Sequence, residues 1–207
     1  MKRPQASELE QIENVTANYF FWQGLRWVPM GVALLVIGLS YSTWWPLGGA
    51  FAEAVPLGAL AAALAASYAL GPYYERAFGR VRSLPEMHRR RETLKWFLWY
   101  PLMGASLAID IQWKPRLFVS GVVWAGGVVA YWWSTGRGRE HYLVVAACMA
   151  AFTFLPITGS VAPGKATANA FVCLLGVAFI LGGLLDHVAL GRVLRPVEDG
   201  GDDEGSV

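Results

Sequence analysis

Residues 76–95 read RAFGRVRSLPEMHRRRETLK, and they place seven basic residues between two long apolar runs. The basic residues are Arg76, Arg80, Arg82, Arg89, Arg90, Arg91 and Lys95. In a soluble protein such a cluster would suggest nucleic-acid binding. Here each flanking run approaches the ~20 residues that cross a bilayer, and Lys and Arg are enriched in the cytoplasmic loops of membrane proteins. The stretch therefore predicts a cytoplasmic loop of a multi-pass membrane protein, and we refer to it as the basic loop.

The composition of the whole chain also predicts a membrane protein. Of the 207 residues, 55% are hydrophobic and only 15% are charged, against roughly 25% charged in an ordinary soluble domain. The mean hydropathy is +0.38. Ten Trp residues lie near the ends of the apolar runs, as expected of an aromatic belt at the membrane–water interface.

Six apolar runs are predicted to form transmembrane helices, so the expected fold is an all-α, six-helix bundle. The runs are residues 25–45, 54–74, 96–113, 117–134, 141–158 and 169–190, and short segments with Pro, Gly or charges separate most of them. Residues 1–24 are predicted to be a cytoplasmic segment with an amphipathic surface helix, because apolar residues recur there at helical intervals. Residues 191–207 are predicted to be an acidic, disordered cytoplasmic tail.

The distribution of basic residues predicts the orientation of this bundle. All but three of the 17 Lys and Arg residues fall on the same side as the basic loop. The exceptions are Lys114, Arg116 and Lys165. By the positive-inside rule both termini are cytoplasmic. The compact loops and the Ala-, Gly-, Val- and Arg-rich composition favour a bacterial inner membrane.

Polar residues at membrane depth are the candidate functional sites, because each is costly to place there. Arg26 and Asp186 lie at matching depths near the cytoplasmic ends of the first and last runs, which suggests an ion pair with His187 nearby as a titratable group. In the alternative, Arg26 reaches lipid headgroups and Asp186 meets Arg192 or water.

Ser106 and Asp110 stand one helical turn apart near the outer end of the third run. One interpretation places them in a cation or proton path. The favoured one pairs Asp110 with Lys114 or Arg116 at the outer interface.

No catalytic, cofactor-binding or metal-binding set is predicted. The three His residues fall in different elements without the spacing of metal ligands. They are His88, His141 and His187.

Small residues recur every four positions in the second apolar run, and this predicts close packing between helices. They form two rows: Gly58, Ala62 and Ala66, and Ala61, Ala65 and Ala69.

The basic loop is expected to contact anionic lipids, at about 1 kcal/mol for each basic residue near the surface. Docking of an acidic cytosolic partner is the alternative. No aromatic residues alternate with its charges to stack on bases, so nucleic acid is not an expected partner.

Two classes of function follow. The first is a non-enzymatic membrane subunit or regulator that acts through helix packing and the basic loop. The second is a small transporter or permease subunit that uses Asp110 or the Asp186–His187 pair in a solute or proton path. The first is favoured, because transporters place their binding sites near the midplane of the bilayer, where this chain has almost no ionisable residues.

Overall fold

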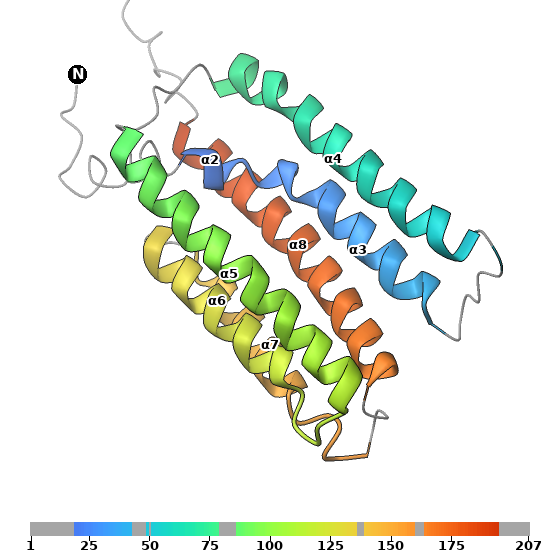
Figure 1. Ribbon diagram of the computed structural model, residues 1–207. Helices are drawn as coiled ribbons and strands as arrows, with labels where there is room; N and C mark the ends of the chain where they lie inside the picture. Colours follow the sequence, from blue (N-terminus) through green and yellow to red (C-terminus); the bar gives the residue numbers. More distant parts are fainter. Residues whose placement is uncertain are drawn as a thin grey trace, which may run out of the picture.

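The computed structural model describes residues 19–42, 49, 51–78, 86–135, 139–159 and 164–194, and Figure 1 shows how their helices are arranged. These residues form helices and turns without strands, which confirms the all-α prediction. The elements are α2 (Tyr19–Trp22), the 3₁₀ turn η1 (Gly24–Arg26), α3 (Val28–Ser40), α4 (Phe51–Phe78), α5 (Glu86–Trp113), α6 (Val119–Thr135), α7 (His141–Phe152) and α8 (Lys165–Leu194). The predicted surface helix, apart from residues 19–24, lies outside the described residues, as does the acidic tail beyond residue 194.

One long helix falls in each predicted apolar run, but two of these helices are shorter than expected. The first run is divided into η1 and α3, and Pro29 lies in the first turn of α3, where its missing N–H is not needed. The fifth run forms a helix only as far as Phe152, and turns continue from there to Gly159. Pro156 lies in these turns and cannot donate a helical hydrogen bond.

Two of the described helices, α4 and α8, are long and apolar enough to cross a membrane. The mean hydropathy of their most apolar segments is 1.6 and 2.3. At ~1.5 Å per residue they are about 42 and 45 Å long, longer than the ~30 Å hydrocarbon core. The helix α6 has only 17 residues, and α5 begins within the basic loop. Length and composition therefore identify two candidate membrane-spanning helices rather than six.

The helix α8 occupies the centre of the bundle. It packs against α3, η1, α5 and α7, whereas α6 packs between α5 and α7. The helix α4 packs on α3 and η1 and forms one edge of the bundle (Figure 1). The main apolar core lies around Phe118, Met149 and Phe171, where α6, α7 and α8 meet.

The interface between α3 and α8 is built on glycines spaced seven residues apart. These are Gly24, Gly31 and Gly38 on the η1–α3 side, and Gly176 and Gly183 on α8. A Cβ atom on Gly31 would lie 2.7 Å from the Gly176 carbonyl oxygen. In the same way, a Cβ on Gly176 would lie 2.7 Å from the Gly31 carbonyl oxygen. Only glycine permits this approach, which brings the two backbones into direct contact.

The small residues of α4 do not pack inside the bundle, so the close packing that their spacing predicts does not involve the described helices of this chain. All six residues of the two rows are exposed, and a Cβ on Gly58 would meet nothing within 4 Å. The helix α4 instead turns Ala63 inward, and that residue is buried. The spacing of small residues indicates a helix face suited to close packing but does not say which helix covers it.

Candidate functional site

A buried ion pair joins the α6–α7 connection to α8. Arg139 precedes α7, and its Nε donates a hydrogen bond of 2.9 Å to Oδ1 of Asp186 on α8. Its Nη2 binds Oδ2 of the same carboxylate, so the pair is bidentate. The Tyr142 hydroxyl donates to Asp186 Oδ2 at 2.6 Å, and His141 Nε2 lies 3.3 Å from Oδ1. Both charged side chains are 0% exposed.

Three aromatic rings surround the guanidinium of Arg139. Its Cζ lies 5.1 Å from the ring centroid of Trp22, 5.0 Å from that of Tyr131 and 4.8 Å from that of Tyr142. At these distances each ring makes a cation–π contact. The rings come from α2, α6 and α7, so Arg139 connects these three elements to α8.

The ion pair keeps its charges although it is buried. Burial by itself lowers the pKa of the Arg139 guanidinium, but the neighbouring Tyr131 and the hydrogen-bonded carboxylate of Asp186 raise it, and the net shift is upward. Removing one partner of such a pair leaves an uncompensated buried charge. We therefore interpret the pair as a structural link that holds the α6–α7 connection on α8.

Arg26 does not bind Asp186, so the predicted ion pair was wrong. Its Nε donates to the Ser67 carbonyl oxygen at 3.2 Å, and its Nη1 donates to Gln23 Oε1 at 2.9 Å. The η1 turn and α8 do meet at this level, since a Cβ on Gly24 would lie 2.7 Å from Asp186 Cβ. It is the glycine of η1 that faces α8, whereas Arg26 reaches toward α4.

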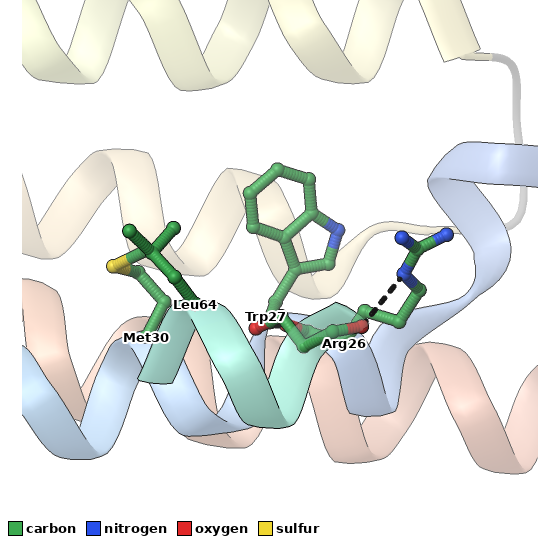
Figure 2. A pocket seen from close by; sticks show the side chains of 5 residues that line it. Arg26, Trp27, Met30 and Leu64 are labelled. Carbon is green, nitrogen blue, oxygen red and sulfur yellow. Dashed lines mark hydrogen bonds between the residues drawn. The ribbon is translucent and has the colours of Figure 1, made fainter. Parts of the chain in front are cut away.

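A small pocket opens between α3 and α4 beside Arg26. Its volume is about 150 Å³, and its lining residues are Arg26, Trp27, Met30, Leu64 and Ser67. In Figure 2 the guanidinium of Arg26 lies at one end, Met30 and Leu64 lie at the other, and the indole of Trp27 stands between them.

His187 belongs to a separate cluster around Tyr74, whose side chain is fully buried. The Tyr74 hydroxyl accepts a hydrogen bond from the Leu25 N–H at 2.9 Å and lies 3.1 Å from His187 Nδ1. The Tyr19 hydroxyl donates to the Tyr74 carbonyl oxygen at 3.2 Å. This cluster links η1, α4 and α8.

Asp110 caps the N-terminus of α6. Its Oδ1 accepts the Val119 N–H at 2.8 Å and its Oδ2 accepts the Ser120 N–H at 2.7 Å. The favoured prediction, a pair with Lys114 or Arg116, was wrong, because both oxygens turn to the unpaired amides and positive dipole end of α6.

Ser106 is buried on the same helix as Asp110. Its hydroxyl donates to the Met103 carbonyl oxygen at 2.7 Å. The side chain of Ser106 therefore forms its hydrogen bond within α5, whereas the side chain of Asp110 bonds to α6.

The basic loop is described only in part. Arg76 is exposed in the last turn of α4, and Arg80 and Arg82 lie outside the described residues. Helix α5 begins at Glu86, so its backbone carries the remaining four basic residues. Among the described residues, no group of three or more His, Cys, Asp or Glu side chains is placed to hold a metal ion.

Arg139 is the residue that sequence reasoning missed. The sequence predicts it as one of several charges in a cytoplasmic loop. The sequence does contain one indication of this role, since Tyr131 and Tyr142 flank Arg139. A cation between aromatic residues at two helix ends is placed to make cation–π contacts.

Comparison with known proteins identifies no relative. No family model, no curated protein and no solved structure matches the chain.

Proposed function

We propose that the chain is a six-span membrane protein that serves as a non-enzymatic subunit of a membrane complex. Helices α3 to α8 cross a bacterial inner membrane, and the end of the bundle that carries the basic loop faces the cytoplasm. The exposed face of α4 packs against a transmembrane helix of another protein. The basic loop then meets anionic lipid headgroups or an acidic cytosolic partner.

The apolar surface of the bundle supports membrane insertion. Large hydrophobic side chains are exposed on several helices, including Leu57 on α4, Val122 on α6, Val144 on α7 and Leu181 on α8. Such extensive exposure is rare in soluble monomers. Arg76 and Arg192 lie at one end of the bundle, as do the basic residues at the start of α5, and Lys114, Arg116 and Lys165 lie at the other.

The main support for the proposed subunit role is the exposure of the two small-residue rows on α4. Faces of this kind let transmembrane helices approach closely, and no helix of the described part of the chain covers them. The transport alternative finds less support, because Asp110 and Asp186 are buried and both oxygens of each carboxylate are hydrogen-bonded within the bundle.

Site-specific photo-crosslinking in intact cells tests this role. A benzophenone amino acid at Ala62 places the probe on a small-residue row, and the same probe at Val122 on α6 is an exposed control. We expect Ala62 to give one discrete adduct with a different membrane protein and Val122 to give none. An adduct of two copies of this chain, or no adduct at Ala62, would contradict the proposal.

A further inference from the structure

The side chain of Tyr74 links the end of α4 to the centre of the bundle. Tyr74 lies one turn before the C-terminal end of α4. Its hydroxyl accepts the Leu25 N–H of η1 at 2.9 Å and lies 3.1 Å from Nδ1 of His187 on α8. The helix α4 packs mainly on α3 and η1. The contact between Tyr74 and His187 is therefore a direct polar link from α4 to the central helix.

The hydrogen-bond pattern around the Tyr74 hydroxyl assigns the protonation of His187. A phenolic hydroxyl has a single hydrogen to donate. The Leu25 N–H already donates to the Tyr74 oxygen, so the hydroxyl hydrogen is directed at His187 Nδ1. Tyr74 is 0% exposed, so its hydroxyl has no access to bulk water as an alternative acceptor. The contact therefore requires a neutral His187 whose ring hydrogen is on Nε2.

Protonation of His187 removes the acceptor of this hydrogen bond. The charged imidazole carries a hydrogen on both nitrogens, so the Tyr74 oxygen then faces two donors. Its own hydrogen keeps no acceptor among the described residues, and a buried donor without an acceptor is destabilising. His187 is partly exposed and lies within two turns of the end of α8, where protons from solvent reach it. Histidine changes its charge between pH 5 and 8.

The aromatic side chains around His187 compensate weakly for this loss. The centroids of the Tyr73, Tyr74 and Phe78 rings on α4 lie 6.1, 5.8 and 6.2 Å from that of the imidazole. These distances are near the outer limit of about 6 Å for cation–π attraction. From α2, the Tyr19 hydroxyl bonds to the Tyr74 carbonyl oxygen.

The charged side chains nearby are directed elsewhere. Asp186, which precedes His187 on α8, binds Arg139, and Arg26 of η1 reaches the Ser67 carbonyl oxygen. The others at this end of α4 and α8 are exposed: Glu75, Arg76 and Arg192. Within the described part of the chain, no ion pair of His187 is found to favour its charged form.

We propose that the Tyr74–His187 hydrogen bond is a pH-sensitive latch. It holds the C-terminal end of α4 against α8 when His187 is neutral, and it releases that end when His187 is protonated. The stability of the bundle should then rise with pH as His187 loses its proton, because protonation breaks a hydrogen bond that exists only in the folded state. The released helix carries the small-residue rows, so acidification should weaken the proposed interface with another protein. This last consequence rests on the proposed subunit role, whereas the latch does not.

Thermal unfolding of the full-length chain in detergent micelles at pH 5.5 and pH 8.0 tests the latch. His187→Asn offers Oδ1, an acceptor that does not titrate, in place of Nδ1, and Tyr74→Phe removes the hydroxyl hydrogen. We expect acidification to lower the unfolding temperature of the unmodified chain by about 2–4 °C more than that of either variant. Tyr73→Phe is the matched control and should keep the full pH dependence, because the Tyr73 ring also lies beside His187.

Amide hydrogen exchange then locates the effect, with the unmodified chain and His187→Asn compared at the same pH. At pH 5.5 the last turn of α4 should exchange faster in the unmodified chain, whereas amides around Ala63 in the middle of α4 should exchange equally. At pH 8.0 the last turn should exchange equally in both.

Two results would overturn the latch. One is a pH dependence of unfolding that both His187→Asn and Tyr74→Phe retain in full. The other is equal exchange in the last turn of α4 at pH 5.5. Both experiments use the isolated chain, so a missing crosslink at Ala62 would contradict the subunit role alone.

Discussion

The Arg139 guanidinium binds both carboxylate oxygens of Asp186, and neither side chain is exposed. Arg139 lies in the connection before α7 and Asp186 in the last third of α8, so the pair spans 47 residues of sequence. It fixes the position of the α6–α7 hairpin relative to the central helix.

Neutralising Asp186 should destabilise the bundle strongly. Asp186→Asn leaves the buried Arg139 charge without its partner, and we expect a loss of about 3–5 kcal/mol. Thermal unfolding in detergent micelles measures this loss. Glu53→Gln makes the same carboxylate-to-amide change at an exposed site in the first turn of α4 and should leave the unfolding temperature unchanged. Equal unfolding temperatures for the two variants would refute the structural role of the pair.

The glycine contact between α3 and α8 should tolerate no side chain. In Gly31→Ala the new Cβ meets the Gly176 carbonyl oxygen at 2.7 Å, and overpacking of this kind costs about 1–3 kcal/mol. Gly126→Ala is the matched control, because a Cβ there meets nothing within 4 Å. We expect only Gly31→Ala to lower the unfolding temperature, and a loss of the same size in both variants would show that the close contact is not the cause.

The carboxylate of Asp110 should stabilise α6 rather than carry a solute. Asp110→Ala leaves the amides of Val119 and Ser120 without their acceptor, and loss of such a cap costs about 0.5–2 kcal/mol. Amide hydrogen exchange should accelerate at these two residues, whereas the last turn of α6 should be unaffected. Unchanged exchange at Val119 and Ser120 would contradict the capping role.

The hydroxyl of Tyr74 should stabilise the folded bundle. In Tyr74→Phe the Leu25 N–H loses its acceptor, and an unsatisfied buried donor costs about 1–3 kcal/mol. Tyr73→Phe is the control, because Tyr73 is 43% exposed and the same atom is removed. In chemical unfolding, Tyr74→Phe should have a lower denaturant midpoint than Tyr73→Phe. Equal midpoints would show that the Tyr74 hydroxyl does not stabilise the fold.

The helices were predictable from the sequence, but most of their contacts were not. Apolar runs predicted the positions of the six main helices in the described part of the chain, because apolar length is a local property of the sequence. The partner of Asp186 is not local. Arg26, Arg139 and Arg192 all lie near the same end of the bundle, and depth alone cannot choose among them. The close approach of α3 and α8 also depends on a register that pairs Gly31 with Gly176, which neither segment specifies by itself.

The central claim, that six helices cross the membrane with the basic loop inside, is tested most directly by labelling single cysteines. After Cys148 and Cys173 are replaced by Ser, one Cys is introduced at a time, at one end of the bundle or at the other. Ser42, Leu117 and Ala166 lie at the end opposite the basic loop, and Ala77, Ser134 and Gly191 lie at the end that carries it.

A membrane-impermeant maleimide is then applied to intact spheroplasts and, in parallel, to lysed ones. We predict that the first three positions are labelled in intact spheroplasts and that the other three are labelled only after lysis. Labelling of both Ser42→Cys and Ala77→Cys in intact spheroplasts would show that α4 does not cross the membrane and would contradict the account.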